Sequence, residues 1–251
     1  MNDMWGTGDY KAVADRIASA GQVVVERAGI EPGMDVLDVA CGTGNATVPA
    51  AKLAARVTGL DFSPGLLAIA REYGADSMVE VEWIEGDAQA LPFEDDSFDR
   101  VISCFGNMFA PDHKRTADEM RRVCRPDGLI AIACWTPDGK IGDMFRRIGA
   151  ISPPPPEDFQ PPTLWGTEEH VRDLLGENAR FERHNVEWRA ESVEGYSEFM
   201  ENSFGPLMAA REQLGDVVHE AYLEYLNDVN EADDGTLLFH GEYLVSVAAP
   251  G

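Results

Sequence analysis

An apolar strand pattern that runs directly into a glycine turn constrains this sequence more than any other feature. Residues 35–39 read Asp-Val-Leu-Asp-Val, and the turn Gly42-Thr43-Gly44 follows two residues later. Parallel α/β sheets bind ligands at the carboxyl ends of their strands, where such a turn connects a strand to a helix. The glycines let a ligand approach the backbone closely, and the next helix presents free N–H groups. The segment therefore predicts a small-molecule pocket at the end of a buried strand.

Strand-like and helix-like patterns alternate through the first 135 residues. Apolar residues at helical spacing predict one amphipathic helix over 9–28, and a second helix is expected over 45–55. Ser63 with Pro64, Asp112 and Thr167 have the residue types that begin helices. This alternation is typical of a parallel, doubly wound sheet. The expected strands are 35–39, 56–60, 79–84, 98–104 and 129–135, followed by two late strands at 181–190 and 236–247.

The pattern changes after Trp135, and no clear second domain follows. The proline-rich stretch 153–162 predicts an irregular segment that crosses the surface. Between the two late strands, bulky apolar residues recur at helical spacing, and we favour helical core packing over an apolar acceptor pocket as their role. These residues are Phe199, Met200, Phe204, Met208, Tyr222 and Tyr225.

The chain is strongly acidic. Its 251 residues include 20 basic and 45 acidic side chains, which gives a formal net charge of −25. Such a charge repels phosphate backbones and anionic lipid surfaces, so we expect no nucleic-acid partner. Adaptation to high salt and an ordinary acidic cytosolic enzyme explain the composition equally well, and the sequence leaves both open.

The four cysteines form no C-x-x-C pair and no metal-ligand spacing, so we expect reduced thiols and no metal site. The first ten residues lack the basic and apolar pattern of a signal sequence. No apolar run approaches the ~18 residues that indicate a membrane span. The expected compartment is the cytoplasm, and the oligomeric state stays open.

Two tests narrow the class of ligand. A dinucleotide fingerprint needs a third glycine where this chain has Thr47, so a pyrophosphate site is disfavoured. Asp38, Asp61 and Asp87 follow or end three successive strands. Asp61 is placed to accept hydrogen bonds from a ribose, Asp87 from an adenine amino group, and Asp38 suits a ligand that carries an ammonium. Together the carboxylates favour a zwitterionic adenosyl ligand.

Four linked motifs carry a family resemblance. They are Val-Leu-Asp-Val-Ala-Cys-Gly-Thr-Gly-Asn at 36–45, Gly-Leu-Asp-Phe-Ser at 59–63, Glu-Gly-Asp-Ala-Gln-Ala-Leu-Pro-Phe at 85–93 and Arg-Pro-Asp-Gly-Leu at 125–129. In this order and spacing they resemble the class I S-adenosylmethionine-dependent methyltransferases. They are most similar to the small-molecule branch that includes the ubiquinone and menaquinone C-methyltransferases. The resemblance covers about residues 33–135 and fades beyond.

The resemblance implies a Rossmann-like fold and a set of residue roles. It implies seven mostly parallel strands with the last antiparallel, an amino-terminal helix and a carboxyl-terminal helical insertion. As one domain, residues 1–30 would cover the site, 31–135 would bind the cofactor S-adenosylmethionine, and 136–251 would hold late strands and acceptor-side helices. The expected cofactor-binding residues are Tyr10, Asp38, Ala40, Gly42, Gly44, Asn45, Asp61, Phe62, Gly86, Asp87, Ala88 and Cys104.

The acceptor side is less defined. Trp5, Phe105 and Met108 are candidate substrate contacts, although Trp5 and Tyr10 serve equally well as packing for the first helix. His113 is the candidate general base, and an exposed position at a helix start is the favoured alternative. Cys41 is expected to fill space beside the cofactor, since no basic neighbour in sequence lowers its pKa.

The leading function is in-line methyl transfer to a small molecule, with S-adenosylhomocysteine as the product. Two other classes stay open. One is a protein that binds S-adenosylmethionine without turnover, as a partner subunit or sensor. The other, disfavoured by Thr47, is an NAD(P)-dependent oxidoreductase. The sequence names neither the acceptor nor the atom that is methylated.

Overall fold

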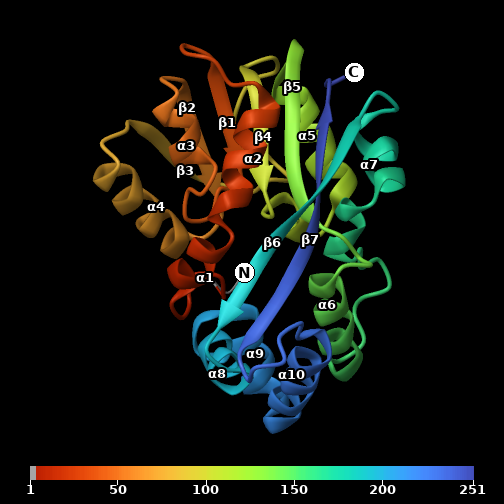
Figure 1. Ribbon diagram of the computed structural model, residues 1–251. Helices are drawn as coiled ribbons and strands as arrows, with labels where there is room; N and C mark the ends of the chain where they lie inside the picture. Colours follow the sequence, from red (N-terminus) through yellow and green to blue (C-terminus); the bar gives the residue numbers. More distant parts are fainter. Residues whose placement is uncertain (1–3) are drawn as a thin grey trace.

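A seven-stranded sheet forms the centre of the computed structural model, which describes residues 4–251 (Figure 1). The strand order is β3-β2-β1-β4-β5-β7-β6, and β7 is the strand that runs against its neighbours. This arrangement confirms the predicted Rossmann-like sheet with an antiparallel last strand. The strands are β1 (Asp35–Val39), β2 (Arg56–Asp61), β3 (Val81–Glu85), β4 (Phe98–Cys104), β5 (Cys124–Trp135), β6 (Arg180–Ala190) and β7 (Leu237–Ala248).

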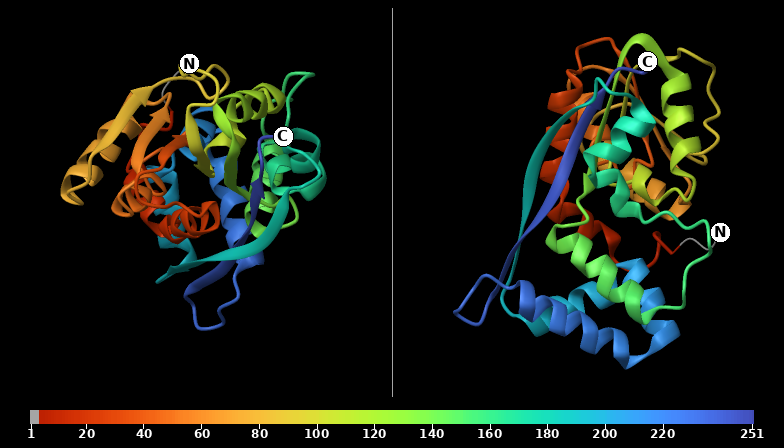
Figure 2. Two further views of the ribbon diagram at one scale, coloured as in Figure 1. Left: turned by 90° about the horizontal axis from the view of Figure 1, so that it is seen from above. Right: turned by 90° about the vertical axis from the view of Figure 1, so that its right-hand side faces the viewer.

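Helices cover both faces of the sheet and one of its ends. α2 and α5 pack on opposite faces of β4 and β5 (Figure 2), and α8, α9 and α10 gather with α6 beyond the carboxyl ends of β1, β4 and β5 (Figure 1). The helices are α1 (Tyr10–Arg16), α2 (Ala18–Ala28), α3 (Thr47–Lys52), α4 (Pro64–Asp76), α5 (His113–Val123), α6 (Lys140–Ile151), α7 (Glu168–Leu175), α8 (Val193–Ser203), α9 (Gly205–Leu214) and α10 (Asp216–Val229). Two short 3₁₀ helices are η1 (Asn107–Phe109) and η2 (Pro162–Gly166).

The buried strands explain why the sheet forms here. Val36, Leu37 and Val39 of β1 have no exposed surface, and the run Ile130–Cys134 of β5 is also fully buried. Strands covered by helices on both faces read as continuous apolar runs, as these do. The core therefore lies on both sides of β1, β4 and β5, and it fixes the strand ends that hold the candidate site.

The predicted helix caps are present. Ser63 Oγ accepts a hydrogen bond from Leu66 N at 3.1 Å, and Pro64 opens α4. Asp112 Oδ1 caps α5 at 2.9 Å, and Thr167 Oγ1 accepts from a backbone N–H in the first turn of α7. Each cap satisfies a backbone donor that the helix leaves free, so short local signals place these three helix starts.

The single helix predicted over 9–28 is wrong, because the chain breaks at Ile17 into α1 and α2. The side chain of Asn45 donates a hydrogen bond to the Ala14 carbonyl oxygen at 2.7 Å. That oxygen also accepts from Ile17 N at 3.1 Å, which is the tighter spacing of a helix end. The glycine turn thus occupies the carbonyl that a continuous helix would use.

Other predicted bounds shift for local reasons. The helix expected over 45–55 is only Thr47–Lys52, because the residues before it complete the glycine turn. The fifth strand begins at Cys124 rather than at residue 129. Arg125 stabilises this early start by pairing with Asp99 at 2.6 Å and with Asp35 at 3.1 Å. Arg125 therefore links three neighbouring strands at the edge opposite the candidate site.

The ribbon of β6 and β7 extends past the rest of the sheet (Figure 1). β5 pairs with β7 only between Tyr243 and Ala248, whereas β6 pairs with β7 over its whole length. The free part of the ribbon reaches α8 and α10, and there Trp188 lies opposite Phe239. One pair of strands therefore belongs to both the sheet and the helical end.

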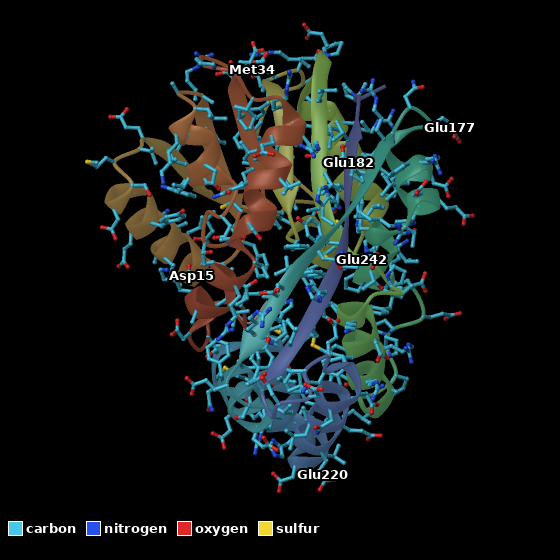
Figure 3. All side chains as sticks on the ribbon, in the orientation of Figure 1. Asp15, Met34, Glu177, Glu182, Glu220 and Glu242 are labelled. Carbon is cyan, nitrogen blue, oxygen red and sulfur yellow. The ribbon has the colours of Figure 1, made fainter. Side chains whose placement is uncertain are left out.

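The acidic side chains are spread over the surface rather than gathered at the site. Asp15, Glu177, Glu182, Glu220 and Glu242 lie on different parts of the molecule (Figure 3). Across residues 4–251, no helix has the length and apolarity needed to cross a membrane. The same residues contain no group of three or more His, Cys, Asp or Glu side chains placed to hold a metal ion.

Candidate functional site

The glycine turn after β1 depends on positive backbone φ angles. Ala40, Gly42 and Gly44 have φ of 53°, 56° and 88°. A Cβ at Gly42 would meet nothing within 4 Å, whereas one at Gly44 would lie 3.1 Å from the Trp83 ring. Gly42 therefore faces open space, and Gly44 allows the turn to pack tightly on β3. Both conformations favour glycine, which explains the Gly-x-Gly spacing.

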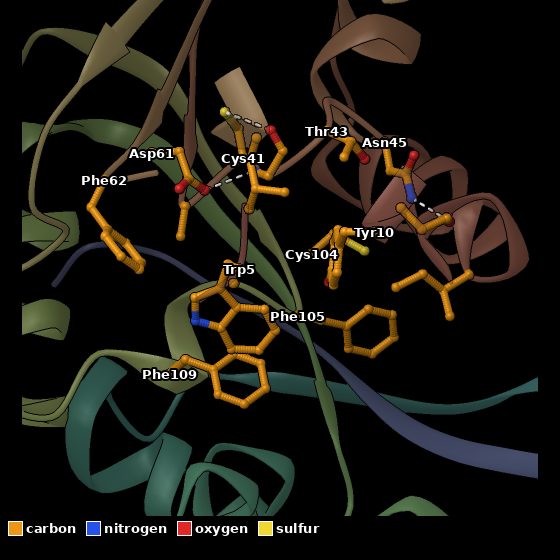
Figure 4. Close-up of a pocket in the computed structure, with 16 residues that line it drawn as sticks. Trp5, Tyr10, Cys41, Thr43, Asn45, Asp61, Phe62, Cys104, Phe105 and Phe109 are labelled. Atoms are coloured by element: carbon orange, nitrogen blue, oxygen red, sulfur yellow. Dashed lines mark hydrogen bonds between the residues drawn. The ribbon is translucent and has the colours of Figure 1, made fainter. Parts of the chain in front are cut away.

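Asp61 holds this turn from the end of β2. Its Oδ2 accepts a hydrogen bond from the Gly42 N–H at 2.8 Å, and its Oδ1 accepts from the Ser63 N–H at 2.9 Å (Figure 4). The side chain is buried, with 3% of its surface exposed. The carboxylate is thereby fixed where β1 and β2 end side by side.

Asp38 lies behind the turn and is almost fully buried. The Thr47 hydroxyl donates a hydrogen bond to Asp38 Oδ2 at 2.5 Å. Oδ1 has no hydrogen-bond partner among the residues that the structure describes. Burial raises the pKa of Asp38 from 3.8 to about 7, although the Thr47 hydrogen bond opposes this shift. The site thus contains one carboxyl whose ionisation needs a positive partner.

Three adjoining cavities surround the ends of β1, β2 and β4. The loop cavity, about 540 Å³ including open solvent, borders the glycine turn and is lined by Trp5, Tyr10, Ala14, Ile17, Ala40, Cys41, Gly42, Thr43, Asn45, Asp61, Phe62, Leu66, Cys104, Phe105, Gly106 and Phe109 (Figure 4). The strand-end cavity, about 860 Å³, is lined by Met4, Trp5, Ala40, Leu60, Asp61, Phe62, Gly86, Asp87, Ala88, Gln89, Gly106, Phe109, Ala110 and Pro111.

The aromatic cavity, about 550 Å³ including open solvent, reaches from the loop cavity into the helical end. Its walls come from α1, α6, α8, α10 and the free part of the β6–β7 ribbon. It is lined by Trp5, Tyr10, Val13, Ile17, Phe105, Phe109, Trp135, Ile141, Met144, Phe145, Trp188, Tyr196, Met200, Phe204, Tyr222, Tyr225 and Phe239.

The cavities share walls, so they lie directly against one another. Asp61 and Phe62 line both the loop cavity and the strand-end cavity. Trp5 and Phe109 line all three cavities, and their rings pack 4.6 Å apart. Figure 4 shows Trp5, Phe105 and Phe109 together beside the labelled turn residues. We call the shared boundary of the loop and aromatic cavities the neck; it consists of Trp5, Tyr10, Ile17, Phe105 and Phe109.

Phe105 is held in the neck by an unusual backbone conformation. Its φ is 60°, which non-glycine residues rarely adopt. The next residue passes close to β1, since a Cβ at Gly106 would lie 2.1 Å from the Ala40 carbonyl oxygen. The Phe105 ring stacks on Trp135 with centroids 3.9 Å apart and planes 6° apart. The crossing of two strand ends therefore fixes an aromatic ring between the two cavities.

The far end of the strand-end cavity is organised by Gln89, which the sequence reasoning missed. Asp87 Oδ1 accepts hydrogen bonds from the Gln89 backbone N–H at 2.8 Å and from its side-chain amide at 3.1 Å. The Gln89 side-chain oxygen accepts from Asp112 N at 3.0 Å. A turn residue thus connects the Asp87 carboxylate to the start of α5.

Most of the predicted site residues line the cavities, but four do not. Asp38 lies behind the turn, Gly44 is the residue of the turn that packs on Trp83, and Met108 is fully buried; none of the three lines a cavity. The residues that do line them are Trp5, Tyr10, Ala40, Gly42, Asn45, Asp61, Phe62, Gly86, Asp87, Ala88, Cys104 and Phe105.

His113 is the fourth exception: it begins α5, as expected, but it is not exposed there. It has no exposed surface and lines none of the three cavities. Its Nδ1 lies 2.9 Å from His170 Nε2, and its ring lies 5.6 Å from that of Trp165. Burial and the neighbouring His170 lower the pKa of His113 to about 4. His113 therefore belongs to the packing between α5, α7 and η2.

The aromatic cavity corrects the expectation for the late helices. Met200, Phe204, Tyr222 and Tyr225 pack in the core, as expected, and they also line this cavity. Its other walls include Trp135, Trp188 and Phe239, which were expected only as strand residues. The one available signal was the high density of aromatic residues after residue 180.

Comparisons with known proteins agree with this geometry. A family model described as a methyltransferase domain matches residues 36–128. An uncharacterised protein of Mycobacterium tuberculosis is 41% identical over 218 residues, covering 85% of this chain and 80% of that protein. A demethylmenaquinone methyltransferase of Staphylococcus aureus is 43% identical over 131 residues, covering 51% of this chain and 53% of that protein. A Bacillus halodurans structure assigned to the methyltransferases has 20% identity and a TM-score of 0.63, covering 91% of this chain and 97% of that one.

Proposed function

We propose that this chain, which carries a methyltransferase domain over residues 36–128, is an S-adenosylmethionine-dependent enzyme that methylates a small-molecule acceptor. One observation carries the proposal. Asp61, fixed by the Gly42 N–H at 2.8 Å, lines both the loop cavity and the strand-end cavity. A buried carboxylate between two joined spaces suits a ligand that continues on both sides of a ribose.

The residues present fit S-adenosylmethionine. In the proposed arrangement, Asp61 binds the ribose hydroxyls, and Phe62, Asp87 and Ala88 surround the adenine in the strand-end cavity. The open space over Gly42 accepts the methionine portion. Asp38 lies behind the turn and attracts the ammonium group of the ligand. Its Oδ1, which has no hydrogen-bond partner among the described residues, is the atom that faces this positive charge in the proposed arrangement. The donor thus occupies the loop and strand-end cavities.

When bound, S-adenosylmethionine supplies a methyl group on a cationic sulfur, which a nucleophile takes in line, leaving S-adenosylhomocysteine. The chain's contribution is alignment and exclusion of water, for which the five apolar and aromatic neck residues are suited. Cys41 and Cys104 also border the loop cavity, but burial raises the pKa of both thiols well above the usual value. We therefore assign them no nucleophilic role.

The chain divides by task in this proposal. Residues 31–135 bind the donor, and residues 136–251 provide the acceptor side. The segment before residue 30 serves both, because Trp5 and Tyr10 line the loop cavity and the aromatic cavity. Trp5 and Tyr10 can therefore both pack against the first helix and cover the site.

Calorimetric titration with S-adenosylhomocysteine and, separately, with NAD tests the donor. We expect tight binding of S-adenosylhomocysteine and none of NAD; the reverse result would refute the proposal. Mass spectrometry of a metabolite library incubated with S-adenosylmethionine then tests turnover through the gain of one methylene mass. Donor binding without any methylated product would instead support a partner subunit or sensor.

A further inference from the structure

The aromatic cavity has a composition that restricts what it can bind. Twelve of its seventeen lining residues are aromatic, and the other five are aliphatic or methionine. None carries a charge. Uncharged walls rich in aromatic rings suit a compact apolar ligand.

Two arginines lie near the walls of this cavity, but neither lines it, and both interact with other groups of the protein. The Arg147 guanidinium lies 6.0 Å from the Tyr225 ring centroid, but it pairs with Asp143 at 3.0 Å and Asp228 at 2.8 Å. Arg16 lies 5.5 Å from the Tyr196 ring and donates to the Arg189 carbonyl at 3.0 Å. Among the described residues, no Arg, Lys or His side chain lines the cavity, so an anionic ligand would be buried there without a direct counter-charge, which is costly.

Stacked rings in the walls favour a flat ligand. Trp188 and Phe239 stack with centroids 5.7 Å apart and planes 7° apart, and Tyr222 and Tyr225 stack with planes 24° apart. With Phe105 on Trp135 and Tyr10 on Phe204, the cavity walls contain four stacked pairs of rings. Planar rings bind such surfaces through offset stacking.

Two buried polar atoms in these walls lack protein partners. The Tyr225 hydroxyl and Trp188 Nε1 have no hydrogen-bond partner within the described residues 4–251. Tyr222, stacked on Tyr225, differs because its hydroxyl hydrogen-bonds with that of Tyr196. Leaving a buried hydroxyl unsatisfied costs stability, and such groups in native structures call for an explanation. A hydrogen bond between the Tyr225 hydroxyl and an oxygen of the ligand would explain the unsatisfied group here.

We infer that the aromatic cavity binds the methyl acceptor, and that the acceptor is an uncharged, planar ring compound whose oxygen substituent hydrogen-bonds to Tyr225. The assignment of this cavity to the acceptor rests on the proposed function, because the neck joins it to the donor space. The chemical class rests only on the walls. Fifteen of the seventeen lining residues lie outside the matched methyltransferase domain at 36–128; Phe105 and Phe109 lie within it.

Three ligands of one ring size test the class: 2-naphthol, 2-naphthoate and naphthalene. Their affinities are measured by fluorescence titration, with and without saturating S-adenosylhomocysteine. We expect 2-naphthol to bind about tenfold or more tightly than 2-naphthoate, since the carboxylate must lose its water without gaining a cation. Equal or tighter binding of 2-naphthoate overturns the inference, as does failure of all three to bind.

A matched pair of variants tests the role of Tyr225. Tyr225→Phe should weaken 2-naphthol binding about fivefold to tenfold, leave naphthalene binding unchanged, and raise Tm, because it removes an unsatisfied buried hydroxyl. Tyr222→Phe should leave 2-naphthol binding unchanged and lower Tm, because it breaks the bond to Tyr196. Equal losses of 2-naphthol binding in both variants, or none in Tyr225→Phe, would contradict the assignment.

These outcomes separate the inference from the proposed function. If S-adenosylhomocysteine binds but no naphthalene compound does, the cavity assignment fails and the methyltransferase proposal stands. If S-adenosylhomocysteine does not bind while 2-naphthol does, the donor proposal fails and the ligand class stands. Loss of the difference between 2-naphthol and 2-naphthoate contradicts the ligand class alone.

Discussion

The Asp61 carboxylate accepts the Gly42 N–H at 2.8 Å, so one side chain at the end of β2 fixes the turn that follows β1. The same carboxylate therefore sets the conformation of the turn and supplies negative charge to the site. The first prediction follows from it, because a change at Asp61 alters both the turn and the proposed ribose contact.

Asp61→Asn should weaken S-adenosylhomocysteine binding by about tenfold to a hundredfold, since a hydrogen bond to a charged group contributes about 1.5–3 kcal/mol. Calorimetry measures this loss. Glu85→Gln is the control, because Glu85 also ends a strand but is exposed and lines none of the three cavities. Unchanged affinity in Asp61→Asn would exclude Asp61 from donor binding.

Asp38→Asn should stabilise the ligand-free protein at alkaline pH. The folded pKa is about 7, above the ordinary aspartate value of 3.8, so the unfolded chain holds fewer protons at Asp38 between these pH values. Stability from this group is therefore complete below about pH 4 and is lost as pH rises through 7. The variant should exceed the natural protein by a few kcal/mol near pH 8 and match it near pH 4. Denaturant unfolding across this range measures the difference.

Asp35→Asn is the control of opposite sign on the same strand. Hydrogen bonds from Arg56 and Arg125 lower the pKa of Asp35, so its stabilisation is present above about pH 4 and is lost as pH falls further. The variant should be destabilised near pH 8, in contrast to Asp38→Asn. Asp38→Asn should also weaken S-adenosylhomocysteine binding, and unchanged affinity would remove Asp38 from the ammonium site.

Asn45→Ala should loosen the contact between the glycine turn and α1. The lost hydrogen bond to the Ala14 carbonyl, 2.7 Å long, is worth about 1 kcal/mol, so donor affinity should fall about fivefold. Because α1 also lines the aromatic cavity, 2-naphthol binding should weaken too. Asn227→Ala removes a similar amide-to-carbonyl bond on exposed α10 and should change neither affinity. A loss confined to the donor would show that the two cavities are not linked through α1.

His113→Gln should change acid stability without changing donor affinity. The folded pKa of His113 is about 4, below the ordinary histidine value of 6.5, so between these pH values the unfolded chain binds more protons at this residue. Stability is thus present above 6.5 and is lost as pH falls towards 4. The variant should lose less stability over this window in thermal unfolding. His184→Gln, at a partly exposed imidazole beside Glu182, is the comparison. Reduced S-adenosylhomocysteine binding in His113→Gln would contradict the placement of His113.

The strands and helix starts of residues 31–135 are well predicted from the sequence, because the sequence signals for them are local. The bounds of β1 and β4 are as predicted, and Ser63, Asp112 and Thr167 cap the expected helices. Apolar runs and caps depend on neighbours within a few residues, so no tertiary information is needed. The three strand-end carboxylates were also identified, although only Asp61 and Asp87 line a cavity.

The walls of the aromatic cavity come from residues that meet only in the folded chain. Trp5, Trp188 and Phe239 share one cavity although more than 180 positions separate the first from the second. The break at Ile17 arises from Asn45, which no helical pattern reveals. His113 looks exposed at a helix start, but α7 and η2 bury it. Long-range contacts of this kind leave no periodic signal in sequence.

The ribbon of β6 and β7 forms the boundary between the central sheet and a group of helices that could be replaced without altering that sheet. Its inner part pairs with β5, and its outer part places Trp188 opposite Phe239 in the aromatic cavity. Helices α8 to α10, residues 193–229, are inserted between these two strands and complete the same cavity. A graft that replaces only these helices with those of a relative would keep the sheet register and the donor residues. Under the proposed function, residues 193–229 are thus one contiguous segment whose replacement would change which acceptor binds.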